Sequence, residues 1–111
     1  MNRVELSILW TPFALNCLDE IYDYIAIKEQ SPTLTLKLIK RIFSSTEQLK
    51  SYPESGQPEP LLKHTGQNSR YLIESNYKII YEVDFRESRV IITDVFHTRQ
   101  NPEKIFRNTS R

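Results

Sequence analysis

Apolar and polar side chains alternate most clearly in the stretch between residues 70 and 100. Within residues 77–85 every second position is apolar, namely Tyr77, Ile79, Tyr81, Val83 and Phe85. This two-residue period is that of a β-strand with one buried face. Residues 71–74 and 89–96 are similarly rich in β-branched and aromatic side chains, and short polar connections separate the three runs. We therefore expect an antiparallel meander of three strands.

The run at residues 89–96 is apolar on both of its faces. Ile91 and Val95 fall on one face, and Val90, Ile92 and Phe96 fall on the other. Strands with two apolar faces are typical of the covered centre of a sheet, so we expect this strand to be central. Polar residues gather at the ends of the stretch, where the working side chains of a sheet tend to lie.

Residues 3–10 also alternate, which predicts a first strand at the edge or in the centre of the same sheet. Thr11 and Pro12 follow, and these residue types favour the N-cap and the first position of a helix. A helix is expected to run from there to about residue 28. Its apolar residues recur with the spacing of one helical face: Ala14, Leu18, Ile21 and Ile25.

Ser31 and Pro32 repeat the capping signal, which predicts a second helix that reaches about residue 50. Its core-facing row is Leu38, Ile42, Ser45 and Leu49, with Leu36, Ile39, Phe43 and Thr46 beside it. Because the link between the two helices is short, they must form an antiparallel hairpin. Both apolar faces then need a common surface to cover, and the sheet supplies it.

The predicted fold is therefore α+β. It has an N-terminal strand, a two-helix hairpin and a three-stranded antiparallel meander, which form a four-stranded sheet with the helices on one face. Residues 1–111 are expected to form a single domain. We expect a surface loop at residues 53–60 and a polar segment that leads into the meander at residues 61–69. A short helix is expected at residues 102–111. The other face of the sheet is expected to stay open, which makes it a natural place for a site.

Composition narrows the class of protein. The single cysteine, Cys17, cannot form an intrachain disulfide, and the N-terminus lacks an apolar signal segment, so we expect a cytoplasmic protein. No apolar run approaches the roughly 20 residues of a membrane span. The two glycines form no phosphate-binding loop, and two histidines with one cysteine make no metal set. We therefore expect neither a metal nor a cofactor.

The net charge of +1 is unevenly distributed along the chain. Residues 1–60 carry six Lys or Arg against eight Asp or Glu, whereas residues 61–111 carry nine against six. The two halves thus differ in sign, which favours a basic, target-facing C-terminal half. The cations are nevertheless too sparse for a nucleic-acid domain that reads sequence.

Six parts of the chain, in their order and spacing, resemble the RelE/ParE superfamily of type II toxins. They are Trp10-Thr11-Pro12 with Ala14, residues 19–25 (DEIYDYI), the YPESG turn at residues 52–56, Arg70, the YKIIY strand at residues 77–81 and the VFHTRQNP ending at residues 95–102. The resemblance covers almost the whole chain. It implies a small toxin of a toxin–antitoxin, or plasmid stabilisation, system. Such a toxin inhibits growth until a cognate antitoxin wraps it in a toxin–antitoxin hetero-oligomer.

Members of the superfamily that the chain resembles have two activities. RelE-like members cut messenger RNA on the ribosome, and ParE-like members bind DNA gyrase. Residues 49–56, Arg70 and the ending at residues 95–99 look closer to the ParE and plasmid-stabilisation branch. The resemblance therefore favours inhibition of DNA gyrase, with a ribosome-dependent, metal-independent endoribonuclease as the alternative.

The nuclease alternative makes a chemical demand. RNA cleavage without a metal needs a base, a cation and an acid around one phosphate. Arg70 is the candidate cation and His97 the candidate acid or base. Glu54 or Glu59 can serve as the base only if the loop that carries them folds inward.

Three further basic residues are candidates for contact with the target. Lys63, Lys78 and Arg99 are the candidates for binding it. Thr98 stands where the most similar nuclease members carry a tyrosine that positions the nucleotide, which favours the ParE-like activity. Structural roles compete with these assignments, because an arginine such as Arg70 can pair with Asp94 or Glu82 across the meander. His97, as a lone histidine at a strand end, can equally be a hydrogen-bonded framework residue.

Overall fold

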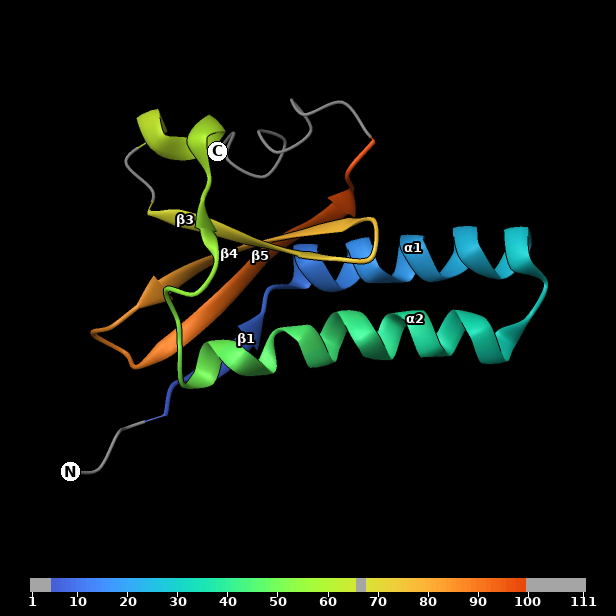
Figure 1. The fold of residues 1–111 in the computed structure, drawn as a ribbon, viewed down its shortest axis with the longest axis horizontal. Helices are drawn as coiled ribbons and strands as arrows, with labels where there is room; N and C mark the ends of the chain where they lie inside the picture. Colours follow the sequence, from blue (N-terminus) through green and yellow to red (C-terminus); the bar gives the residue numbers. More distant parts are fainter. Residues whose placement is uncertain (1–4, 66–67, 100–111) are drawn as a thin grey trace.

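The computed structural model describes residues 5–65 and 68–99, and for residues 63–65 it describes the backbone. The predicted order of elements is confirmed, and the fold is α+β (Figure 1). The elements are β1 (Ser7–Trp10), α1 (Pro12–Glu29), α2 (Pro32–Ser45), the 3-10 helix η1 (Glu47–Lys50), β2 (Gln57–Pro58), the 3-10 helix η2 (Pro60–Thr65), β3 (Ser69–Glu74), β4 (Tyr77–Asp84) and β5 (Arg89–His97).

The sheet has five strands in the order β1-β5-β4-β3-β2, one more than predicted. The added strand is β2, which pairs with β3 and lies in the stretch predicted to be a loop. Pro58 hides it from sequence analysis, because proline is tolerated only in edge strands and reads as a breaker. β1 lies at the opposite edge, parallel to β5. β5 is thus an interior strand between β1 and β4, as predicted from its two apolar faces, although β4 occupies the middle of the five-stranded sheet.

Both helices begin where their capping signals predict. The Thr11 hydroxyl accepts a hydrogen bond from the Ala14 N–H at 3.1 Å, and the Ser31 hydroxyl accepts one from the Leu34 N–H at 3.3 Å. A proline follows each cap at the start of the helix. These bonds satisfy amides that would otherwise lack a partner in the first turn, so the sequence alone fixes both starts.

The second helix ends earlier than predicted, at Ser45 instead of about Lys50. The Ser45 hydroxyl donates to the Ile42 carbonyl at 2.7 Å, and the Thr46 hydroxyl donates to the Phe43 carbonyl at 2.7 Å. Serine and threonine side chains compete in this way with the helical hydrogen bonds. The chain continues as the tighter η1 up to Lys50.

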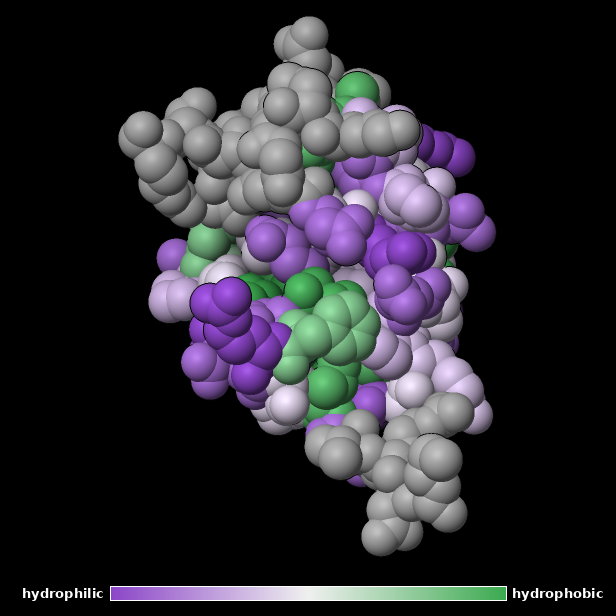
Figure 2. Space-filling view, turned by 90° about the vertical axis from the view of Figure 1, so that its left-hand side faces the viewer, coloured by the Kyte–Doolittle hydropathy of each residue, from purple (hydrophilic) through white to green (hydrophobic). Residues whose placement is uncertain are grey.

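The main core lies between the helical hairpin and one face of the sheet (Figure 1). It contains most of the residues predicted for it: Ala14, Leu18, Ile42, Leu49, Tyr77, Ile79, Tyr81, Val90 and Ile92, with Ile21 and Leu38 packed at its margin. Four predicted apolar members lie outside it: Ile25 is only partly buried, and Leu36, Phe43 and Phe85 are 48%, 39% and 60% exposed. Phe85 belongs to the connection between β4 and β5. Figure 2 shows an apolar area bordered by hydrophilic residues on one side of the molecule.

A β-bulge in β5 overturns one predicted face. Ile80 pairs with Asp94 and Tyr81 with Ile92, so Thr93 is an extra residue on β5. Beyond the bulge, Val95 joins Val90 and Ile92 in the main core, whereas the alternation predicted that it would lie on the opposite face from them. A single inserted residue reverses the alternation, and its position is set by pairing between strands rather than by local pattern.

The second face of the sheet is partly covered, whereas it was predicted to be open. Leu62 of η2 packs there against Ile80 and Phe96. Leu61 and Tyr71 border this second cluster. The helix predicted at residues 102–111 and the first residues of the strand predicted at residues 3–10 lie outside the described part of the chain.

Candidate functional site

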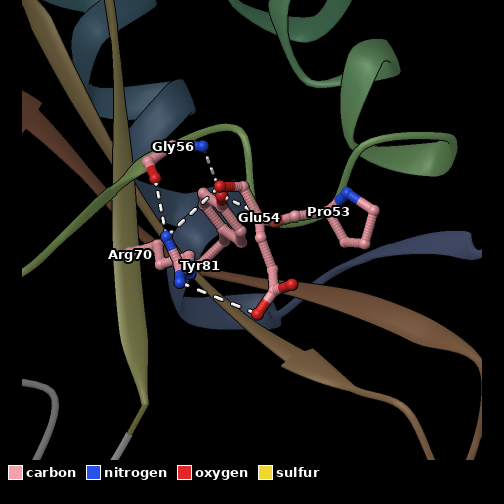
Figure 3. Close-up of polar contacts among 5 residues, drawn as sticks. All are labelled: Pro53, Glu54, Gly56, Arg70 and Tyr81. Carbon is pink, nitrogen blue, oxygen red and sulfur yellow. Dashed lines mark hydrogen bonds and ion pairs between the residues drawn. The ribbon is translucent and has the colours of Figure 1, made fainter.

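Arg70 of β3 holds the turn that precedes β2 (Figure 3). Its Nη1 donates to the Gly56 carbonyl at 2.9 Å and to the Glu54 carbonyl at 3.2 Å. Its Nη2 lies 3.7 Å from Glu54 Oε2. The predicted pairing with Asp94 or Glu82 is therefore wrong. Arg70 does form an ion pair with Glu54, one of the two candidate bases. Its other two contacts are hydrogen bonds to backbone carbonyl oxygens.

Tyr81 of β4 holds the same turn from the core. Its hydroxyl donates to the Pro53 carbonyl at 2.8 Å and accepts from the Gly56 N–H at 2.9 Å. Burial is the main reason that the pKa of the phenol is raised above its ordinary value of 10.0. The hydroxyl thus keeps its proton at neutral pH and acts as donor and acceptor at once.

Two further contacts complete the turn at residues 52–56. The Ser55 N–H donates to the Tyr52 carbonyl at 3.1 Å, and the Gln48 side chain of η1 donates to the Ser55 hydroxyl at 2.8 Å. A Cβ on Gly56 would lie 2.6 Å from the Tyr71 carbonyl oxygen, closer than such atoms approach. We call this set, the turn with Arg70 and Tyr81, the clamped turn. These hydrogen bonds hold the backbone conformation of the turn in the protein alone, without a binding partner.

Lys78, a predicted target-binding residue, is engaged inside the protein. Its ammonium lies 2.6 Å from Glu59 Oε2, and the Glu59 side chain is completely buried. The same ammonium lies 4.2 Å from the centre of the Tyr71 ring, a cation–π contact. Glu59 Oε1 also accepts from the Leu61 N–H at 3.2 Å. The second candidate base is therefore paired with Lys78, and together they fasten η2 to the sheet.

His97 lies at the end of β5. Its Nδ1 accepts from the Arg99 N–H at 3.0 Å, so in the neutral ring the proton is on Nε2. The ring meets Tyr77 edge to face, with 5.3 Å between centroids. His97 and Arg99 border a groove of about 740 Å³ between α1 and the end of the sheet. Thr98 and Arg99 are exposed, and the side chain of Lys63 lies outside the described residues.

Arg70 and His97 are not brought together in this structure. Arg70 pairs with Tyr81 of β4, whereas His97 pairs with Tyr77 of the same strand. Four residues of strand correspond to about 13 Å along the sheet, and two further strand spacings separate the residues laterally. In this structure the Arg70 guanidinium contacts the turn at residues 54–56, whereas the His97 ring contacts Tyr77 and Arg99, so the two side chains do not converge on one position.

Neither the clamped turn nor the Glu59–Lys78 pair was predicted from local sequence patterns. Tyr81 was expected in the core, and its hydroxyl function depends on a turn 28 residues earlier in the chain. Because a buried tyrosine hydroxyl needs a hydrogen-bond partner, the predicted burial of Tyr81 indicated that some polar group must lie beside it. Glu59 stands between two prolines in a loop-like stretch, and nothing in the local pattern predicts a buried carboxylate there.

The described residues contain neither a metal-binding cluster nor a membrane-spanning helix. Within residues 5–65 and 68–99, no three His, Cys, Asp or Glu side chains cluster closely enough to hold a metal ion. None of the helices described combines the length and apolar composition that crossing a membrane requires.

Comparison with known proteins gives a consistent assignment. The sequence model of the ParE toxin of the type II toxin–antitoxin system parDE matches residues 8–102. The chromosomal ParDE toxin–antitoxin system from P. aeruginosa contains a chain of similar fold, with a TM-score of 0.69 and 20% identity. That match covers 87% of this chain and 100% of the other.

The toxin–antitoxin complex RelBE2 from Mycobacterium tuberculosis also contains a similar chain. Its TM-score is 0.55 at 16% identity, and the match covers 86% of this chain and 94% of the other. Among curated proteins no match was found. At these identities the two solved structures show the fold, whereas the family match spans most of the sequence. The chain therefore belongs to the ParE toxin family of type II toxin–antitoxin systems.

Proposed function

We propose that this protein arrests growth by inhibiting DNA gyrase and that a cognate antitoxin neutralises it in the cytoplasm. Family membership supports the toxin role. The similar P. aeruginosa and M. tuberculosis chains come from toxin–antitoxin systems, which supports an antitoxin partner. Gyrase is the target of the ParE-like members that the sequence resembles.

The observation that carries the choice of gyrase is the engagement of Arg70. A metal-independent nuclease must aim a cation at the phosphorane oxygens, close to its acid and its base. The Arg70 guanidinium is instead bonded to two carbonyls of the clamped turn, and His97 lies elsewhere on the sheet. Glu59 is neutralised by Lys78. Among the described residues, the arrangement therefore favours inhibition by contact with a protein over cleavage of RNA.

Induction in cells with two parallel readouts tests the proposal. The first is gyrase-dependent DNA breakage or loss of supercoiling, and the second is codon-specific cleavage of ribosome-bound messenger RNA. We expect gyrase damage with intact messages. Cleaved messages with normal supercoiling, and cleavage abolished by His97→Ala in a protein that still folds, would establish the nuclease instead.

Arg70→Ala does not discriminate between the two activities, because it also releases the clamped turn. Arg70→Lys serves as its matched variant, since it keeps the charge but not the planar guanidinium, whose Nη1 donates to two carbonyls while Nη2 lies beside the Glu54 carboxylate. Each variant needs a thermal unfolding curve before its activity is interpreted.

The antitoxin partnership has its own test. We expect a short gene adjacent to this one to encode a protein with a disordered segment that folds on binding. Co-expression of that gene should restore growth in cells that produce the toxin. If growth stays arrested although both proteins accumulate, that neighbour is not the antitoxin.

A further inference from the structure

The two helices of the hairpin carry opposite charges. The charged residues of α1 are four acids and one lysine: Asp19, Glu20, Asp23, Glu29 and Lys28. The charged residues of α2 are all basic: Lys37, Lys40 and Arg41. Solvated helices commonly mix both signs on one face, whereas here each helix has one predominant sign.

Four of these charges point away from the core. Asp19 and Asp23 are four residues apart, and Lys37 and Lys40 are three apart, so each pair shares one face of its helix. All four are exposed, and among residues 5–65 and 68–99 none of them has an ion-pair partner. Arg41 differs, because its Nη2 donates to a serine of the β3–β4 turn at 2.6 Å. Since both helices lie side by side on one face of the sheet, their outward faces form one surface (Figure 1).

Apolar side chains lie beside these charges. Leu15 precedes Asp19 by four residues, and Leu36 precedes Lys40 by four, so each leucine is next to a charge on the same side of its helix. The two leucines are 42% and 48% exposed. Apolar contacts bordered by charges have the composition of a protein interface. We call the surface formed by these four residues with Asp23 and Lys37 the outer face of the hairpin.

Opposite charges stand at similar heights along the hairpin. The link between the helices is Gln30 and Ser31. The two aspartates lie 11 and 7 residues before Gln30, and the two lysines lie 6 and 9 residues after Ser31. With a rise of about 1.5 Å per residue, the heights of the acidic and basic pairs agree to about 3 Å. A two-fold axis that lies in the outer face, parallel to the helices, therefore places the acids of one copy opposite the bases of another.

We propose that the outer face of the hairpin joins two copies of this chain in a symmetric dimer. Each α1 packs antiparallel on α2 of the other copy, which makes a four-helix arrangement. Asp19 and Asp23 of one copy meet Lys37 and Lys40 of the second copy, and symmetry repeats the contact. A partner surface of a single sign would be repelled by one of the two helices, so a second copy matches this face better than a uniformly acidic or basic protein does.

The size of the outer face sets the expected affinity. α1 has 18 residues. Its length is thus about 27 Å and two adjacent helices are about 20 Å wide, so each copy contributes roughly 500 Å². The total of about 1,000 Å² lies at the lower limit for specific interfaces. We therefore expect a reversible dimer with a dissociation constant in the micromolar range, which salt weakens because exposed charges contribute to it.

Analytical ultracentrifugation of the purified protein measures the association. Between about 1 and 200 μM, the wild type should change from monomer to dimer. Two double variants reverse the charges, Asp19→Lys with Asp23→Lys and Lys37→Glu with Lys40→Glu. Each should weaken self-association at least about tenfold, because equal charges then face one another. An equimolar mixture of the two variants should form a heterodimer, since α1 of each variant then meets α2 of the other with opposite sign.

A charge reversal elsewhere on the surface provides the control. Glu87 is exposed in the connection between β4 and β5. Glu87→Lys should therefore change the dissociation constant by less than about twofold. Thermal unfolding shows whether each variant is folded, which separates loss of the contact from loss of the fold.

Three results would overturn the inference. A wild type that stays monomeric over the whole concentration range forms no such dimer. Charge-reversed variants that associate as tightly as the wild type place the contact on another surface. A mixture that stays monomeric, although both variants are folded, refutes the pairing of α1 with α2. Neither gyrase nor an antitoxin takes part in these measurements, so their outcome is independent of the proposed function.

Discussion

Removal of one oxygen atom tests whether the clamped turn stabilises the protein. Tyr81→Phe deletes a hydroxyl that donates to the Pro53 carbonyl at 2.8 Å and accepts from the Gly56 N–H at 2.9 Å. The ring itself is fully buried in the main core and keeps its packing in the variant. The measured effect therefore reports the two hydrogen bonds and little else.

The size of the effect follows from the two bonds. Each contributes about 1 kcal/mol to the free energy of unfolding, and a buried N–H that loses its acceptor adds a desolvation cost of similar size. We expect Tyr81→Phe to lower the free energy of unfolding by roughly 2–3 kcal/mol. For a domain of this length, that corresponds to a fall in Tm of about 8–12 °C.

Urea and thermal denaturation followed by circular dichroism measure this loss. Tyr24→Phe is the matched control, because Tyr24 is 62% exposed and its hydroxyl should contribute within about 0.5 kcal/mol. A loss below about 0.5 kcal/mol for Tyr81→Phe would show that the turn is not held through this hydroxyl. Faster exchange of the Gly56 amide in the variant locates the effect in the turn.

Three other substitutions probe separate contacts. Gly56→Ala should destabilise by about 1–3 kcal/mol in urea denaturation, because the new Cβ meets the Tyr71 carbonyl oxygen at 2.6 Å. Lys78→Met should cost about 3 kcal/mol, since it leaves the Glu59 carboxylate buried without its cation, and removal of both charges should recover most of the loss. Burial raises the pKa of Glu82, so its contribution to stability is present below the ordinary value of 4.5 and is lost as pH rises through the folded-state pKa. The stability advantage of Glu82→Gln over the wild type should therefore grow from pH 4 to pH 7 in thermal unfolding, and an advantage that does not change with pH would contradict this reasoning.

Local sequence signals were sufficient to predict the starts of the helices and the order of the elements. Thr11 with Pro12 and Ser31 with Pro32 fix the helix starts, because the capping bonds reach only three residues along the chain. The apolar periods then decide which face is buried. These features depend on neighbours in sequence, so one sequence contains enough information to place them.

Features that depend on partners distant in the sequence were missed. The bulge at Thr93 is defined by the pairing between β4 and β5, and it reversed the predicted face of Val95. β2 exists because β3 offers it an edge, although Pro58 argues against a strand locally. The open face was partly filled by η2 because Leu62 reaches Ile80 and Phe96. Local patterns cannot report such contacts, since either partner alone is compatible with several structures.

The partners of the candidate site residues were missed for a related reason. Chemistry singled out Arg70 and Lys78 as cations, but cations contribute to a site only when they remain available. Two cations that looked free in sequence are bonded to Glu54, Gly56 and Glu59 in the structure. Their carbonyl and carboxylate partners lie in the irregular stretch between α2 and β3, which was expected to be a loop at the surface.

This use of charge bears on how the toxin acts. Of the four cations singled out in the sequence, Arg70 and Lys78 fasten the clamped turn and η2 to the sheet, and Arg99 is exposed at the end of β5. The net positive charge of the C-terminal half is therefore larger than the number of cations that are free to contact a phosphate backbone on the described surface. Nucleic-acid binding draws its affinity from several free cations acting together, whereas contact with a protein can rest on a few preformed surfaces. The internal engagement of Arg70 and Lys78 is therefore one reason for proposing a protein target instead of a nucleic acid.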